Sequence, residues 1–498
     1  MRLTVRLTTR LTVRLTTRLT AALALAVAGT RGALGAQGVA PAARPDSARA
    51  YTFEQFARQV RAHHPVARQA RLSADHAREE VRVARGAFDP TVSASWDQKT
   101  FGGTEYYDYL SAALRIPTPL GADLKIGYER ADGRYISADR RTPERGLVTA
   151  GLSIPLGQRL LTDERRNALT VARALRGVAD ADRAAALNRL LLGAAKDYGR
   201  WYEAARRLGV AQEGVTLAAF RLRAVRARVL NGDAAAIDTV EALVELQRRQ
   251  VQAAEAEQSA FATTLTVTAY LWDARGAPID LPERAAPVAG VVAAGVDEDP
   301  AAVAQLVARA ERQHPDLRKV DGRVDQAEAQ RQLARQQVIP FAEAELSSLA
   351  NRRGEALGSP FATDDDYKAG LTVRTALLFM KERGRFNAAT LRLEQQEVER
   401  SRVRREIGYA VRVAVNDLAT VGRLLGIQRT TVEQARLLRD GEQRKFENGE
   451  STLFLVNARD RLVLDEQLKL AALEARALGA RAELAVSVGD AGELAGAP

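Results

Sequence analysis

Apolar residues recur at helical spacing along two very long stretches of the chain that contain no proline. These stretches, residues 164–229 and 383–447, are rich in Ala, Leu, Arg and Glu. A helix of the first length would span about 99 Å. In the second stretch the apolar positions are spaced by 4, 4, 3 and 7 residues: Ile407, Val411, Val415, Leu418 and Leu425. Such a narrow stripe is typical of a coiled-coil seam and predicts packing against other long helices.

Each long tract ends at an Asn-Gly pair, Asn231-Gly232 in the first and Asn448-Gly449 in the second. Both residue types tolerate positive φ, so a helix can end and the chain can reverse within a few residues. Helical pattern resumes at about residues 235–273 and 451–488. The pattern therefore predicts two long helical hairpins with tips near residues 231 and 449.

Acidic and hydroxyl residues follow both Asn-Gly pairs. Asp233 comes after the first pair, and Glu450 and Ser451 come after the second. Such residues cap the free N–H groups at the start of a helix. We therefore expect them to begin the returning helices.

The apolar period changes from helical to alternating in four other segments. Two of these segments begin at Thr91 and Phe341, and the other two end at Leu156 and Leu377. Their alternation predicts strands. Residues 105–130 contain a further hairpin pattern, which either extends a sheet or folds over one end. Five tyrosines nearby suit either a membrane interface or packing within loops: Tyr106, Tyr107, Tyr109, Tyr128 and Tyr135.

The order of elements occurs twice. The intervals from Pro65 to Pro90 and from Pro315 to Pro340 are both 25 residues long, and each joins a predicted helix to a predicted strand. The two tip glycines, Gly232 and Gly449, lie 217 residues apart. We therefore expect a tandem duplication, with a first repeat at 51–273, a linker at 274–300 and a second repeat at 301–489.

The N-terminus carries the pattern of a secretory signal peptide at residues 1–28. A basic segment precedes a short apolar stretch, which ends in the small-residue site Ala26-Val27-Ala28, and a second candidate cleavage site follows Ala36. The alternatives are an amphipathic surface helix or a misread start. No later stretch has 18 consecutive apolar residues, so a membrane crossing would have to use strands.

Composition favours helices over stacked globular cores, because 46% of residues are hydrophobic, 27% are charged and only 5% are aromatic. The formal charge is +11, and loss of the five arginines in residues 1–28 would leave +6. Arginine and glutamate are interspersed along the helices and not gathered in a patch, which argues against nucleic-acid binding. The chain has no cysteine, which excludes disulfides and cysteine metal sites.

Residues with catalytic or metal-binding potential are few. Three of the four histidines, His63, His64 and His314, lie near the expected starts of the repeated helices, and the fourth is His76. Asp364-Asp365-Asp366 is interpreted as a solvated or weakly cation-binding loop. Phosphate-binding, nucleophile-elbow and zinc-binding patterns do not occur. We predict no enzyme, no cofactor and no metal site.

The duplicated His-Pro helix starts, the strand entries after Pro90 and Pro340, and the tip segment from Phe446 to Ala458 together resemble the TolC-like outer-membrane efflux protein family. That family commonly has Asn-Pro where this chain has His-Pro. The resemblance covers the chain from about Phe53 to Gly489.

The resemblance implies an α+β membrane protein that assembles as a homotrimer. Twelve strands from three chains would close a transmembrane β-barrel in outer-membrane lipid, continued by a long α-helical coiled-coil barrel in the periplasm of a Gram-negative-type envelope. It implies export of small molecules or proteins through a passive conduit that docks a periplasmic adaptor (membrane fusion) protein and an inner-membrane transporter. No nucleic acid is implied, and the transporter would choose the cargo.

The resemblance also assigns roles to single residues. An adaptor would dock at the hairpin tips: Asn231, Gly232, Asp233, Asn448, Gly449, Glu450 and Ser451. Asp238 falls where the family has an acid near the periplasmic constriction. The acidic positions of the second repeat are occupied by Leu455 and Ala458, which puts an acidic ring in doubt.

The neighbouring Arg459 and Asp460 are interpreted as part of a solvated helix face. Two other functions fit parts of the pattern. A structural coiled-coil protein of the envelope would lack two registered strand pairs, and a periplasmic adaptor would have one hairpin.

Overall fold

The computed structural model describes residues 49–288, 298–350 and 366–495. Residues from Ala48 onward form one compact unit. The predicted signal peptide at residues 1–28 lies outside the described residues, as do Asp364 and Asp365.

Eight α-helices lie in the described ranges, four on each side of the linker. The first four are α1 (Phe53–His63), α2 (Pro65–Gly86), α3 (Glu164–Leu230) and α4 (Ala236–Thr268). The second four are α5 (Pro300–Gln313), α6 (Pro315–Gln337), α7 (Met380–Glu447) and α8 (Leu453–Val488). The two long helices and their returning partners are therefore confirmed. None of the described helices combines the length and apolar character needed to cross a membrane.

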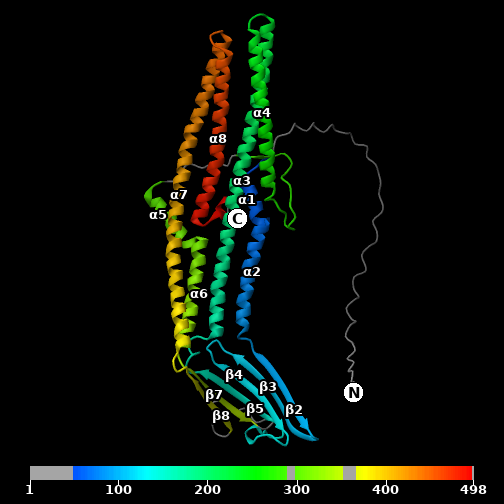
Figure 1. Cartoon of the computed structure of the whole chain (residues 1–498), viewed down its shortest axis with the longest axis vertical. Coiled ribbons are helices and arrows are strands. Elements are labelled where there is room, and N and C mark those ends of the chain that lie inside the picture. Colours follow the sequence, from blue (N-terminus) through cyan, green and yellow to red (C-terminus); the bar gives the residue numbers. More distant parts are fainter. Residues whose placement is uncertain (1–48, 289–297, 351–365, 496–498) are drawn as a thin grey trace, which may run out of the picture. The chain divides into compact units, whose positions relative to one another are not determined.

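Each long helix is flanked by two shorter helices that follow one another along its length (Figure 1). α2 and α4 pack on α3, while α6 and α8 pack on α7. Contacts of α3 with α6 and α8 join the two halves. The predicted seam is confirmed, because Ile407, Val411 and Val415 are buried in one apolar cluster with residues of α5, α6 and α8.

An aromatic core lies at the middle of α3 and holds the shorter elements. Tyr198 is fully buried among Phe53, Phe56 and Trp201. Its hydroxyl donates to the Tyr51 carbonyl oxygen at 2.6 Å and accepts from the Val288 amide at 3.1 Å. These bonds hold a two-stranded parallel sheet formed by β1 (Arg49–Tyr51) and β6 (Ala285–Pro287). Burial raises the pKa of Tyr198 to about 12, so the hydroxyl keeps its proton.

Two histidines cap the helices that lead into the strands. Nδ1 of His64 accepts a hydrogen bond from the Val66 amide, and Nδ1 of His314 accepts one from the Asp316 amide, both at 3.2 Å. Proline is the first helical residue in each case. Their interpretation as helix-start residues is confirmed.

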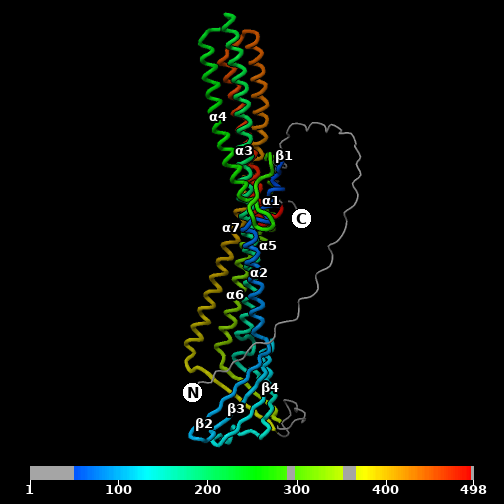
Figure 2. The backbone as a smooth tube through the Cα atoms, turned by 90° about the vertical axis from the view of Figure 1, so that its right-hand side faces the viewer, coloured from blue at the N-terminus to red at the C-terminus, as the bar shows by residue number. Residues whose placement is uncertain are grey.

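A six-stranded antiparallel sheet lies at one end of the long helices, opposite the two tips (Figures 1 and 2). Its order is β2 (Thr91–Phe101), β3 (Thr104–Pro117), β4 (Asp123–Asp132), β5 (Leu147–Pro155), β7 (Phe341–Ala350) and β8 (Tyr367–Arg374). The four predicted strands are present. The additional hairpin, β3–β4, lies within the sheet between β2 and β5 and does not fold over an end. The described sheet of one chain therefore has six strands, two more than the four that the resemblance implies for each chain.

The register gives the sheet one apolar and one polar face, because residues paired across neighbouring strands share a face. The apolar face of the first three strands carries Val92, Ala94, Trp96, Leu110, Ala112, Leu114, Ile116, Leu124, Ile126 and Tyr128, and at the ends far from the helices it also carries Gln98, Asp108, Arg130 and Asp132. The same face continues through Val148, Ala150, Leu152, Ile154, Ala342, Ala344, Leu346, Ala369, Leu371 and Val373. Ser, Thr, Lys, Glu and Arg predominate on the other face.

The five tyrosines separate into different environments. Tyr128 lies on the apolar face, whereas Tyr107 and Tyr109 stack on each other on the polar face with ring centroids 4.9 Å apart. Tyr106 packs against Tyr135 of the following loop at 4.8 Å. Tyr128 therefore lies on the face that suits a lipid interface, whereas Tyr107 and Tyr109 lie on the opposite face.

Candidate functional site

The two hairpin tips have the same backbone geometry. Gly232 and Gly449 adopt left-handed φ values of 81° and 79°. The next amide bonds back across the turn, Asp233 to the Arg228 carbonyl and Glu450 to the Lys445 carbonyl, both at 2.8 Å. This is the Schellman ending of a helix, which needs glycine because a side chain is strained at that φ.

The caps of the returning helices differ from the prediction. Helix α8 begins after Thr452, whose hydroxyl accepts from the Leu455 amide at 3.4 Å, while Ser451 donates to Glu442 at 2.5 Å. Helix α4 begins after Ala235, which has no side-chain acceptor. Capping by Asp233, Glu450 or Ser451 is therefore wrong, because the turn needs two further residues before the helix starts.

The predicted tip residues are exposed, apart from the half-buried Ser451. The two tips approach each other through Arg228, whose guanidinium lies 5.3 Å from the centre of the Phe446 ring. Below this contact, Leu222, Val225 and Ala242 of the first hairpin form an apolar cluster with Leu453 of the second. The tips thus present polar, exposed turns on a shared apolar base.

Asp238 lies in the first turn of α4, three residues after the cap, and is half-buried. Leu455 occupies the matching place after Thr452 in α8 and is 40% exposed. The structure therefore brings one acid and one leucine to equivalent positions of the two hairpins.

Charged side chains form an ionic cluster between the hairpins that was not predicted. Arg221 of α3 donates to Asn457 of α8 at 2.7 Å and pairs with Asp460 of α8. Glu245 of α4 pairs with Arg461 of α8 at 2.6 Å and with Arg249 of its own helix at 2.9 Å.

Asp460 is only 5% exposed, so its interpretation as part of a solvated face is wrong. Arg459 is half-buried and lies 3.7 Å from Glu442. The sequence signal for this cluster was the presence of charged residues on helix faces that also carry apolar seam positions. Burial alone would raise the pKa of Glu245, but its ion pairs with Arg461 and Arg249 outweigh this and hold the pKa below its usual range.

The outer helices carry exposed apolar seams of their own. On α4 the seam follows heptad spacing and lies opposite the face packed on α3: Ile237, Val240, Val244, Val251, Phe261 and Leu265. A matching seam runs along α7: Val413, Leu424, Ile427 and Leu438. Apolar heptad seams exposed on a single chain are the normal partners of other helices.

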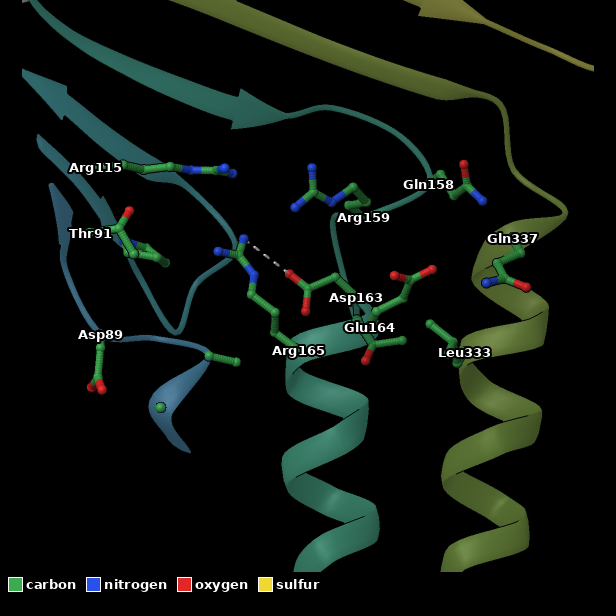
Figure 3. A pocket seen from close by; sticks show the side chains of 14 residues that line it. Asp89, Thr91, Arg115, Gln158, Arg159, Asp163, Glu164, Arg165, Leu333 and Gln337 are labelled. Carbon is green, nitrogen blue, oxygen red and sulfur yellow. Dashed lines mark ion pairs between the residues drawn. The ribbon is translucent and has the colours of Figure 1, made fainter. Parts of the chain in front are cut away.

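A cavity of about 600 Å³ lies where the sheet meets the helices (Figure 3). Arg115, Arg159 and Arg165 line it, opposed by Asp89, Asp163 and Glu164. Nearby, buried Asp123 pairs with Arg115 and with Arg165, which joins the start of β4 to the first turn of α3. Because three arginines face three acidic side chains, the positive charge is balanced and the cavity does not favour an anion. We interpret these charges as the contact that joins the sheet to the helices.

Comparison with known proteins agrees with this geometry. Residues 306–490 match the family model described as outer membrane efflux protein. No curated protein matches the chain in sequence.

The chain is similar to the solved structure of CusC, with a TM-score of 0.61, 14% identity and coverage of 88% of this chain and 92% of that one. It is also similar to the open state of MtrE of Neisseria gonorrhoeae, with a TM-score of 0.60, 15% identity and coverage of 88% of this chain and 89% of that one. The outer-membrane channel OprN has a TM-score of 0.59, 16% identity and coverage of 88% of this chain and 89% of its own. The predicted resemblance is confirmed: residues 306–490 match the outer membrane efflux protein family model, and the chain has the TolC-like fold of these solved channels.

Proposed function

We propose that this protein is a trimeric outer-membrane channel, a passive conduit through which an inner-membrane transporter exports its substrates. The two-faced sheet is the observation that carries the proposal. Apolar residues predominate on one face of all six described strands and polar residues on the other, which is the pattern of a wall between lipid and water.

The exposed seams supply the reason for assembly. A single chain leaves β2 and β8 as sheet edges and leaves the α4 and α7 seams uncovered. In a ring of three copies, α4 of one chain would pack against α7 of the next, and β2 would pair with β8. Each copy would thereby cover apolar surface and unpaired backbone groups that are costly to expose.

The hairpin tips provide the docking surface for a periplasmic adaptor. They are the exposed ends of the longest helices, and both present the same Asn-Gly turn. The ionic cluster just below holds the two hairpins of one chain together. Docking would open the conduit by separating or rotating these hairpins, with Asp238 at the constriction. The tandem duplication is part of this proposal, because it places two equivalent tips on each chain.

The native mass of the protein, extracted in mild detergent from the outer-membrane fraction, tests the proposal. We expect about three times the mass of the processed chain, since closure of the barrel requires several copies. A monomer, or a water-soluble species absent from that fraction, would contradict the proposal and favour a structural coiled-coil protein.

A further inference from the structure

The two halves of the chain contribute unequally to the sheet. Four strands lie between α2 and α3, whereas the described residues between α6 and α7 form two. The difference is the β3–β4 hairpin, which turns at residues 118–122 near the helices. An additional hairpin either joins the sheet as two further strands or folds over one face of the sheet as a cover. The hydrogen-bond pairing of its strands distinguishes these two cases.

The hairpin is paired on both sides along most of its length. Every residue from Asp123 to Glu129 of β4 has a partner on β5, and β3 is paired with β2 from Thr104 to Arg115 apart from one irregularity. The side chains also continue the apolar face, since Leu114 pairs with Ile126 and Ile126 with Ala150. A cover would be paired on one side at most and would not match the face of its neighbours.

The polar face shows the same continuity. Lys125 of β4 reaches across β5 to Glu345 of β7 and pairs with it at 2.9 Å. Gly151 is the β5 partner of Lys125, and an added Cβ there would overlap Ser347. The strand lengths are sufficient as well, because β3 has 14 residues and β4 has 10, and about 9–11 tilted residues cross a membrane.

We propose that β3 and β4 are full members of the membrane wall, so that each chain supplies six strands and three chains close an eighteen-stranded barrel. Lipid covers the apolar face, and a second copy of this chain pairs with each sheet edge. The inference rests on the proposed channel function. It makes the barrel about 1.5 times as wide as one of twelve strands, because diameter grows roughly linearly with strand number.

Spin labels on single cysteines test the inference, since the chain has no native cysteine. Leu114→Cys and Ala113→Cys place labels on opposite faces of β3, and Leu371→Cys with Thr372→Cys do the same on the edge strand β8. Purified trimers in liposomes are exposed to oxygen, which concentrates in lipid, and to a water-soluble nickel chelate. We expect a several-fold higher oxygen-to-nickel accessibility ratio at Leu114 than at Ala113, matching the contrast between Leu371 and Thr372.

The outcomes separate the inference from the proposed function. A contrast on β8 without one on β3 would overturn the eighteen-stranded barrel and leave the channel in place. No contrast on either strand would overturn both. Ile126→Cys and Lys125→Cys repeat the test on β4 and decide the matter if a β3 variant fails to assemble.

Discussion

A histidine caps each of the two helices that lead into the sheet, and its ring must be neutral to accept the capping hydrogen bond. Nδ1 of His314 accepts the Asp316 amide, and a protonated nitrogen cannot accept. Burial lowers the pKa of His314, an effect that the nearby Asp316 carboxylate partly offsets. The cap therefore contributes fully above the unfolded-state pKa of about 6.5 and is lost as pH falls through the lower folded-state value.

Replacing His314 with Asn should keep the cap and weaken its pH dependence, because an amide oxygen accepts at every pH. His314→Ala should destabilise the protein by about 1 kcal/mol at neutral pH. Thermal unfolding midpoints of the three proteins at about pH 7.5 and pH 5.5, on either side of the usual histidine pKa, would show this. An equal loss of stability on acidification in the native protein and His314→Asn would contradict the mechanism. His64 supplies the remaining dependence, since burial also lowers its pKa.

Replacing either of two glycines with alanine, one in α7 and one in its tip, should change the stability of this segment in opposite directions. Gly449 has φ of 79°, so Gly449→Ala should destabilise the tip by about 1 kcal/mol. Gly441 lies within the helix with no neighbouring atom within 4 Å of an added Cβ. Gly441→Ala should therefore stabilise the same segment by about 1 kcal/mol. Amide hydrogen exchange near the second tip measures both, and changes of the same sign would rule out this account.

Between elements, the ionic cluster decides how the first hairpin meets the second. Asp460 is buried against Arg221, so removal of one partner leaves an unpaired charge in a poorly solvated place. The pairs also bring polar groups into a seam that is otherwise apolar.

Arg221→Met alone should therefore destabilise the packing of the hairpins by about 3 kcal/mol, and Arg221→Met with Asp460→Leu should recover most of the loss. Hydrogen exchange in the outer half of α8 reports the packing. Arg223→Met, an exposed arginine of the same helix, is the control and should have little effect. A double variant as unstable as the single one would show that the charges do not act as a pair.

For the whole molecule, the exposed seam of α4 predicts where copies meet. Val251→Asp should prevent formation of the proposed trimer, because burying an unpaired carboxylate at the contact costs several kcal/mol while a single chain keeps Val251 59% exposed. Gln250→Asp adds the same charge one residue away, outside the seam, and should leave the trimer intact. Native mass in detergent distinguishes the two. Dissociation of both variants, or of neither, would place the contact elsewhere.

The sequence by itself determined the elements whose causes are local. Proline placement predicted the starts of α2 and α6, alternation predicted β2 and β7, and Asn-Gly predicted both turns. Those features depend on the preferences of neighbouring residues. The position of the cap at Thr452 was missed because turn length depends on how the second helix packs.

Only the tertiary structure decided features that join distant parts of the chain. The β3–β4 hairpin could have covered the sheet or entered it, and its entry depends on pairing with β2 on one side and β5 on the other. The sequence pattern predicted that Asp460 lies on a solvated helix face, but in the structure it is buried against Arg221 of α3. Both outcomes depend on which surfaces meet in space, because burial and pairing are properties of two elements together and are absent from the local pattern of either one.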